Sequence, residues 1–400
     1  MKPGEGELVV PGFRAAGIHC GIKARTRDLA LVVSDAPATI AGVFTQSTVV
    51  GAPVPWSRER VRRGTARALV VNSGISNVAM GARGRRDNRT LAGWVARHVG
   101  CPVGQVVTGA TGVIGEPLPM AKLRAGIPRA HAALRPRGLA AAAQAIRTTD
   151  TFAKTAVRRV RLGGELVTVA GIAKGSGMIE PKMATMLAYV FTDAAIAAAP
   201  LQGLVRSAAD ASFNRLSIDG ETSTSDCFVA FAGGMAGNPM LRTVASTDAR
   251  RLAGALNEVC ESLVRDLARD GEGATKLVTI DVRRAASPAE AEIAARRIAN
   301  SALVKTALFG QDPNWGRILQ TVGAGRVSLR ESRAVVKLGG VAVFEHGAST
   351  GSAARRRADL RMAEPEITIE VDLAAGRAAT RMWTCDFSYD YVRINAEYTT

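Results

Sequence analysis

Aromatic residues and histidine are scarce in this sequence of 400 residues, which contains four Trp, four Tyr, ten Phe and four His. Since 47% of the residues are nevertheless hydrophobic, Ala, Val, Leu and Ile must fill most of the interior. A chain of this length and apolar content can bury a large core and more than one structural unit. We therefore expect a globular protein of the size of an enzyme.

Cysteine is also rare, and its spacing suits neither a disulfide framework nor a zinc site. The chain has five widely spaced cysteines and no C-x-x-C pair: Cys20, Cys101, Cys227, Cys260 and Cys385. We therefore expect no bound metal. No apolar run approaches the roughly 20 residues of a membrane span. The opening "MKPGEGELVV" lacks the basic-then-apolar pattern of a signal segment, so the sequence predicts a cytoplasmic protein without a membrane partner.

Acidic residues are outnumbered by basic ones, which gives a formal net charge of +17. The excess is spread along the chain, with only short clusters such as "RERVRR" (58–63) and "ARRRA" (354–358). No segment alternates basic and aromatic residues as a platform for stacked bases would, so we expect no nucleic-acid partner. Acidic small-molecule substrates are compatible with this charge.

Strand-like and helical patterns are mixed along the chain. Strands are predicted at 28–35, 66–74, 164–173, 275–282, 333–345 and 366–374, and one at 104–115 runs into a Gly-rich turn. Helices are predicted at 85–100, 137–150, 200–216 and 246–270, the last with Ser246 or Thr247 as its N-cap. The order is not a regular βαβ alternation, so the expected class is a mixed α/β fold.

Polar, Gly-rich segments at the ends of apolar runs are the candidates for chemistry. They are "TGATGVIG" (108–115), "RTTDTFAK" (147–154), "KGSGMIEPKMAT" (174–185), "DGEGATK" (270–276), "KTALFGQDPNWGRI" (305–318) and "YVRINAEYTT" (391–400). The first has neither dinucleotide-binding nor Walker spacing, and its backbone N–H groups could stabilise an oxyanion. Lysine is uncommon in this Arg-rich chain, yet several lysines lie in or beside these segments: Lys174, Lys182, Lys276 and Lys305.

Thr185 opens the β-prone run "TMLAYVF" directly after the third of these segments. A threonine hydroxyl is a poor nucleophile unless a base is close, and His19, His98, His131 and His346 all lie outside the segments. The base could instead be the α-amino group of Thr185 itself, whose unperturbed pKa is about 7.7–8.0. That group exists only if the chain is cut between Ala184 and Thr185.

Taken together, the polar segments resemble the ornithine acetyltransferase (ArgJ) family. The similarity runs from "GFRAAGIHCGIK" and "LALVVSDAPATIAGVFT" through "KGSGMIEPKMATMLAYVFTDA", "TGVIG", "TTDT", "DGEGATK" and "VKTALFGQDPNWGRIL" to the final "YVRINAEYTT". The resemblance implies a layered α-β-β-α fold of the ArgJ/DmpA-like type, self-cleaved into chains 1–184 and 185–400. It also implies an assembly of two copies of each chain.

The family's activity implies transfer of an acetyl group from N2-acetylornithine to glutamate through an acetyl ester on Thr185, in ping-pong fashion. No cofactor is implied, although acetyl-CoA is a second acetyl donor in some members. The oxyanion hole would be formed by Thr111 and Gly112. The implied substrate contacts are Thr151, Lys174, Thr185, Glu272, Asn395 and Thr400. From their charges, we expect Lys174 to face a substrate carboxylate and Glu272 a substrate amine.

This sequence departs from the usual family pattern in places, which leaves other functions open. It has "SGISNVAMG" (73–81) and "DGETSTSDCFVAFAGG" (219–234) where members usually read "SGNANACTG" and "DGDTSTNDT" plus an aliphatic run. "ATG" and "FGQD" replace "STG" and "FGED". A paralogue that acylates other amino acids, a Thr- or Ser-headed amidase or aminopeptidase, and a non-catalytic binder are the alternatives.

Overall fold

The computed structural model describes residues 7–180 and 186–397, and its largest element of architecture is an eight-stranded mixed sheet. The strand order is β4-β3-β2-β8-β7-β6-β5, and β1 pairs with β2 outside this path. The strands are β1 (Phe13–Ile18), β2 (Leu29–Phe44), β3 (Thr65–Ile75), β4 (Val106–Val113), β5 (Lys154–Leu162), β6 (Glu165–Lys174), β7 (Leu187–Thr192) and β8 (Cys227–Ala232).

Strand β2 is 16 residues long and belongs to two parts of this sheet. Its first part pairs with β1 and β3, and its last part, Thr39–Phe44, pairs with β8. The register against β3 shifts between Val33 and Ala38, as in a β-bulge, which bends a strand and increases its twist. The bend lets the β1–β4 part of the sheet face the β5–β8 part.

Contacts across the interior show that the two parts pack face to face. The rings of Phe13 on β1 and Phe191 on β7 lie 5.5 Å apart, although the two strands are not neighbours in the sheet. One buried cluster combines Val32 and Val71 of the first part with Ile172 and Phe231 of the second. The interior of the molecule is therefore a β-β interface made of one folded sheet.

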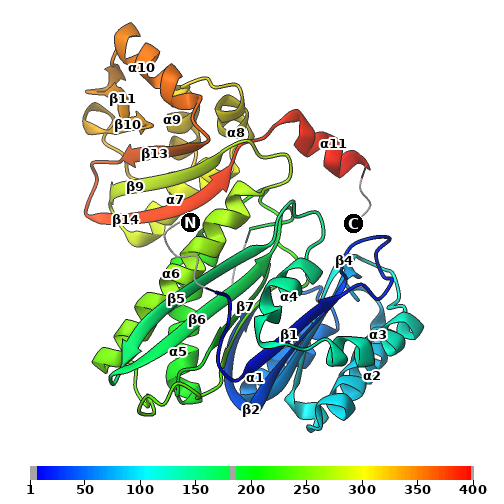
Figure 1. Cartoon of the computed structure of the whole chain (residues 1–400). Helices are drawn as coiled ribbons and strands as arrows, with labels where there is room; N and C mark the ends of the chain where they lie inside the picture. Colours follow the sequence, from blue (N-terminus) through cyan, green and yellow to red (C-terminus); the bar gives the residue numbers. More distant parts are fainter. Residues whose placement is uncertain (1–6, 181–185, 398–400) are drawn as a thin grey trace.

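Helices cover the outer faces of both parts (Figure 1). α2 (Gly81–Val99) and α3 (Met120–Ala132) pack on the β2–β4 side, and α5 (Ala198–Ala211) and α6 (Thr247–Arg269) pack on the β5–β8 side. The shorter helices α1 (Pro53–Arg63) and α4 (Leu139–Ala145) add side chains to the β-β interface. The predicted layered α-β-β-α arrangement is thus confirmed.

A second unit forms the C-terminal part of the chain, drawn in yellow to red in Figure 1. Its six-stranded sheet has the order β12-β11-β10-β13-β9-β14. The strands are β9 (Leu277–Ala285), β10 (Val335–Leu338), β11 (Val341–Glu345), β12 (Ala348–Ser349), β13 (Glu366–Asp372) and β14 (Ala378–Cys385). The helices are α7 (Pro288–Asn300), α8 (Ala302–Phe309), α9 (Trp315–Gly323), α10 (Ser352–Met362) and α11 (Tyr389–Glu397).

Helix α6 joins the two units, because Leu277, Trp383 and Cys385 of the second sheet belong to the buried cluster that α6 forms with β5–β8. Ser246 is the N-cap of α6 and accepts a hydrogen bond from the N–H of Ala249 at 3.1 Å, which decides between the two predicted caps.

Among the described residues, none of the helices combines the length and apolar character that a membrane crossing requires.

Two predicted segments differ from the structure. The strand predicted over 104–115 was expected to run into a Gly-rich turn, but β4 continues through these glycines, because its pairing with β3 extends as far as Val113. The segment 305–318 was read only as a motif, and it contains the end of α8 and the start of α9. The predicted chain division at 184/185 falls between the neighbouring strands β6 and β7 and stays a prediction.

Candidate active site

The ends of β4 and β6 bring a predicted oxyanion residue and a predicted substrate contact together. The Nζ atom of Lys174, the last residue of β6, donates a hydrogen bond to Oγ1 of Thr111 on β4 at 3.2 Å. Both side chains are buried. Because an ammonium group only donates hydrogen bonds, the Thr111 oxygen is the acceptor, and its own O–H is available to another partner.

Gly112 follows Thr111 at a position that no other residue can occupy without a rearrangement. Its φ is 125°, and a Cβ atom built there would lie 2.3 Å from the carbonyl carbon of Gly74 on β3. The close approach of these two backbones requires glycine at residue 112. The assignment of Thr111 and Gly112 as an oxyanion hole stays a prediction, and their adjacent positions at the end of one strand fit it.

The segment that precedes the predicted cleavage site is held by hydrogen bonds to two carboxylates. The N–H of Gly175 donates to Asp150 Oδ1 at 2.7 Å, and the N–H groups of Met178 and Ile179 donate to Asp219 at 2.6 and 2.8 Å. Met178 has a positive φ of 55°, an uncommon conformation for a residue with a side chain. The path of the chain up to Glu180 is therefore strongly determined.

Ala184 and Thr185, the predicted cleavage site and nucleophile, lie outside the described residues, and so does Thr400. Their described neighbours show where the chain resumes. Met186 is buried, and Leu187 begins β7 paired with Lys174 on one side and Cys227 on the other. Thr185 therefore precedes, by two positions in the sequence, a residue that is paired with the Lys174 backbone.

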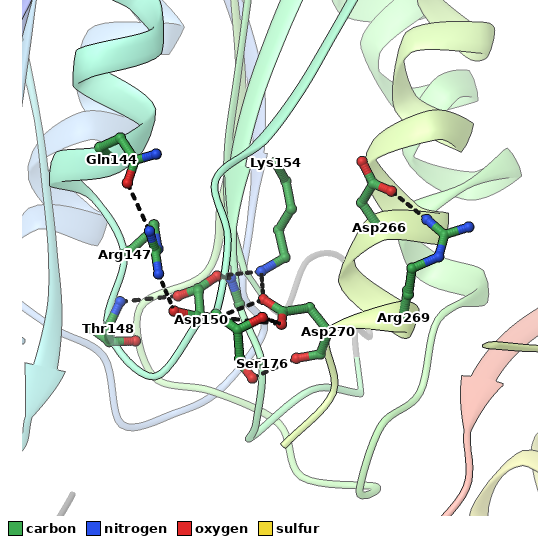
Figure 2. Close-up of polar contacts among 11 residues, drawn as sticks. Gln144, Arg147, Thr148, Asp150, Lys154, Ser176, Asp266, Arg269 and Asp270 are labelled. Atoms are coloured by element: carbon green, nitrogen blue, oxygen red, sulfur yellow. Dashed lines mark hydrogen bonds and ion pairs between the residues drawn. The ribbon is translucent and has the colours of Figure 1, made fainter. Parts of the chain in front are cut away.

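Asp150, Lys154 and Asp270 form a buried charge cluster (Figure 2), and the Lys174 ammonium is close enough to act on Asp150. The Lys154 ammonium donates to Asp150 Oδ1 at 2.6 Å and also to a carboxylate oxygen of Asp270. The three side chains are at most 3% exposed. Thr151, a predicted substrate contact, donates its backbone N–H to Asp270 at 3.0 Å and its hydroxyl to the same carboxylate.

Glu272 and Asn395, two further predicted substrate contacts, are also brought together. The Nδ2 group of Asn395 on α11 donates to Glu272 Oε2 at 2.9 Å. Glu272 is 8% exposed, and its backbone N–H donates to the Ser176 carbonyl at 2.8 Å. A Cβ atom on Gly177 would lie 2.3 Å from the Glu272 carboxylate, so the glycine allows this contact with the segment before the cleavage site.

Burial and charge shift the pKa values of the two central groups. Burial lowers the pKa of the Lys174 ammonium, and the attraction of Asp150, the next largest influence, opposes this. Burial by itself would raise the pKa of Asp150, but Lys174, Lys154 and the hydrogen bonds to its carboxylate outweigh it. The net result is an Asp150 pKa below its ordinary value, so this carboxylate is ionised at neutral pH.

A cationic cavity of about 450 Å³ opens next to the cluster. Its lining, taken from the described part of the chain, includes Lys23, Arg25, Arg27 and Arg147 and no carboxylate. Lys23 Nζ donates to the Arg147 carbonyl at 2.8 Å, which ties the cavity to the segment that leads to Asp150 and Thr151. A field of this sign favours the approach of acidic small molecules.

None of the four histidines is buried. His19, His98 and His346 are exposed, and the His98 and His131 rings lie 6.1 Å apart on helices α2 and α3. Within the described part of the chain, no group of three or more His, Cys, Asp or Glu side chains could hold a metal ion.

Lys154 and Asp270 are the residues that sequence reasoning missed. Lys154 ends the segment "RTTDTFAK" and Asp270 begins "DGEGATK", but neither was assigned a role. Lysine is scarce in this chain, so a lysine in a polar segment is a candidate for a role; Lys154 meets this criterion, but only Lys174, Lys182, Lys276 and Lys305 were singled out. Their pairing connects positions 116 residues apart, and no local pattern indicates such a contact.

Comparison with known proteins agrees with the resemblance seen in the motifs. The sequence model of the ArgJ family matches residues 14–400. The arginine biosynthesis bifunctional protein ArgJ of Geobacter sulfurreducens is 46% identical over 392 residues, which covers 98% of this chain and 100% of that protein. The protein of the same name from Synechococcus sp. is 44% identical over 406 residues, covering 99% of this chain and 98% of that protein.

A solved structure is similar as well. The crystal structure of the arginine biosynthesis bifunctional protein ArgJ from Bacillus halodurans has a TM-score of 0.50 and 38% sequence identity, and covers 52% of this chain and 98% of that chain. From the match over nearly the whole length, we conclude that this chain belongs to the ArgJ family.

Proposed function

We propose that this protein cuts its own backbone between Ala184 and Thr185 and then transfers an acetyl group from N2-acetyl-L-ornithine to L-glutamate, as a step of arginine biosynthesis. The observation that carries the proposal is the family match over residues 14–400, and it is supported by two contacts between predicted site residues, Thr111 with Lys174 and Glu272 with Asn395. The relatives named above are called bifunctional, which supports acetyl-CoA as a second acetyl donor.

In the first half-reaction, the α-amino group of Thr185 accepts the proton of the Thr185 hydroxyl while the oxygen attacks the acetyl carbonyl carbon. The carbonyl oxygen becomes an oxyanion, to which the Thr111 hydroxyl and the Gly112 N–H would donate. One such donor is worth roughly 3–4 kcal/mol of the barrier. The C–N bond then breaks, and the nitrogen takes the proton from the α-amino group, so ornithine leaves and an acetyl ester remains.

The second half-reaction runs the same steps in reverse with a different amine. The amino group of glutamate attacks the ester carbonyl, its proton passes to the α-amino group of Thr185, and the threonine oxygen leaves with that proton. Lys174 has three N–H donors, and within the described residues one of them binds Thr111; the others would bind a substrate carboxylate. Glu272 would bind an amine of the substrate.

The experiment that tests the proposal is intact mass spectrometry of the purified protein, alone and after brief exposure to N2-acetylornithine. We expect two fragments that divide at 184/185, and one added acetyl group on the C-terminal fragment that glutamate then removes. A Thr185→Val variant should stay uncut and gain no mass. A fully active preparation that consists of one unbroken chain would refute the mechanism.

Glutamate also distinguishes transfer from hydrolysis. Acetylglutamate should accumulate as N2-acetylornithine is consumed, whereas release of free acetate at the same rate with and without glutamate would indicate an amidase. We further propose two copies of each fragment in the assembled enzyme and a cytoplasmic location. Sedimentation of the cleaved protein and fractionation of cells check these two points.

A further inference from the structure

Two threonines at the site form hydrogen bonds of opposite direction with buried charged groups: the Thr111 hydroxyl accepts one, and the Thr151 hydroxyl donates one. Thr111 Oγ1 accepts from the Lys174 ammonium, so its O–H can only be directed at a different acceptor. Thr151 donates both its backbone N–H and its hydroxyl to Asp270. Because the Thr151 proton is occupied, the lone pairs of this oxygen are what it can offer to a ligand.

The orientation of Thr151 depends on Asp270 being a carboxylate and not a neutral acid. Asp270 accepts from the Lys154 ammonium as well as from Thr151, and its neighbour Asp150 accepts from Lys154, Gly175 and Thr148. Two buried ammonium groups, Lys154 and Lys174, face these two carboxylates. A neutral residue in place of Asp270 would take from the buried Lys154 ammonium one of its two carboxylate partners, which is unfavourable.

Thr151 itself is exposed, whereas Asp270 behind it is 4% exposed. Thr151 can therefore be reached by a ligand, whereas its carboxylate partner cannot. Asp270 also fixes the neighbouring segment, because its backbone carbonyl accepts from the Ser176 hydroxyl at 2.6 Å. The position of Thr151 is thus tied to the segment that leads towards the predicted cleavage site.

We propose that Lys154 and Asp270 are positioning residues that hold the Thr151 hydroxyl as a hydrogen-bond acceptor for the N–H on the nitrogen that carries the acetyl group. This inference rests on the proposed acetyl transfer. An amide has an acceptor oxygen and a donor nitrogen, and the two threonines offer the complementary pair: Thr111 donates to the oxygen and Thr151 accepts from the nitrogen.

The same contact serves both half-reactions. When the C–N bond breaks, the nitrogen of ornithine gains one proton and keeps an N–H for Thr151. When glutamate attacks, its amine loses one proton to the Thr185 α-amino group and directs another N–H at Thr151. On this proposal the leaving and the entering nitrogen occupy one position.

The test compares N2-acetylornithine with its ester analogue 2-acetoxy-5-aminopentanoate, in which oxygen replaces the N–H group. The quantity measured is the ratio of kcat/KM for the amide to kcat/KM for the ester, so the greater intrinsic reactivity of the ester cancels between variants. We expect Thr151→Val to lower this ratio about tenfold and Thr151→Ser to preserve it. Asp270→Asn, which can donate to the hydroxyl and reverse its orientation, should also lower the ratio.

Thr275 provides a matched control. It donates its N–H at 2.8 Å and its hydroxyl at 2.5 Å to one carboxylate, Asp386, and it is exposed like Thr151. Thr275→Val should leave the amide-to-ester ratio unchanged even if it lowers stability. If the ratio were the same within twofold in wild type, Thr151→Val and Thr275→Val, the proposal would be overturned.

A measurement without any variant guards against misfolding of the mutants. As a competitor with N2-acetylornithine, the ester should bind to the wild-type enzyme about tenfold more weakly than the amide. Equal binding would refute the acceptor role of Thr151. A wild-type protein that is neither cut nor acetylated by either compound would instead refute the proposed function, so the two failures are distinguishable.

Discussion

Each of the two units buries a lysine completely, but the surroundings of the two lysines differ. Lys154 in the layered unit contacts two carboxylates, Asp150 and Asp270. Lys305 in the C-terminal unit donates to the Thr384 hydroxyl at 2.8 Å and to the Cys385 carbonyl, and its ammonium lies 4.5 Å from the centre of the Phe387 ring. Within the described part of the chain, the hydrogen bonds of Lys305 go to neutral groups, and Asp386 and Asp219 act on its charge from a longer distance.

The difference shows what each lysine is needed for. Lys305 connects α8 to the end of β14 by hydrogen bonds to neutral acceptors. Such contacts stabilise the packing of the two elements without a charged partner. Lys154 holds two carboxylates whose other hydrogen bonds determine the positions of Thr151 and Gly175. A buried network of charges is rigid when every member has a partner, and rigidity of this kind is what a reaction site requires.

The largest expected difference between the two units is in the effect of replacing a glycine by alanine. Gly112→Ala should lower kcat by about 10²–10³-fold, because the new Cβ atom collides with Gly74 and displaces a predicted oxyanion donor. Gly340 in the β10–β11 turn has a φ of 81° and no atom within 4 Å of a built Cβ, so Gly340→Ala should cost only about 1 kcal/mol of stability. Steady-state kinetics and urea unfolding measure both. Equal kcat values for the two variants would contradict the comparison.

Replacing each lysine by methionine tests the comparison directly. Lys154→Met removes the ammonium group that contacts both buried carboxylates, Asp150 and Asp270, and should lower the free energy of unfolding by about 3–5 kcal/mol. Lys305→Met removes hydrogen bonds to neutral groups and should cost about 1–3 kcal/mol. Both are measured by urea unfolding in an uncleaved Thr185→Val background, so that unfolding involves a single chain. A larger loss for Lys305→Met would reverse our interpretation.

The pH dependence of stability should report on the burial of Lys305. Burial lowers the pKa of Lys305 below its ordinary value of 10.5, against the attraction of Cys385, Asp386 and Asp219. Just below pH 10.5 the unfolded chain therefore holds a proton that the folded chain has lost, so the stability contributed by this site rises with pH. Lys305→Met should remove that rise. An identical alkaline profile for the variant and its parent would show that Lys305 is not the cause.

The smallest expected effect is at an exposed ion pair of the C-terminal sheet. Arg381 on β14 donates two hydrogen bonds to Asp281 on β9, at 2.7 and 2.9 Å, and the arginine side chain is 49% exposed. A double-mutant cycle of Arg381→Ala and Asp281→Ala should give a coupling energy of about 0.2–1 kcal/mol, because solvent screens the pair. A coupling energy as large as the loss expected for Lys154→Met, about 3–5 kcal/mol, would mean that burial does not explain why the two contacts differ in strength.

Parts of the fold were accessible from local sequence patterns. The mostly apolar run 164–173 predicted β6, and the sequence around Ser246 predicted the start of α6. The bend of β2 near Val33–Ala38 was not predicted, because it arises where two different strands pair with successive parts of one strand. The helices α8 and α9 were not predicted, because the polar and glycine residues between them obscure the helical spacing of apolar residues.

The sequence by itself determined the mixed α/β class, the family and the separate segments that carry the predicted site residues. These properties depend only on residue type and on the order of residues along the chain. The site residues in question are Thr111, Thr151, Lys174, Glu272 and Asn395. Only the tertiary structure decided which of these side chains meet and which way their hydrogen bonds run. Lys154 and Asp270 are distant in the chain, and burial in the folded protein turns their attraction into a strong and directional contact. Direction of this kind depends on partners and solvent exposure, which exist only after the chain has folded.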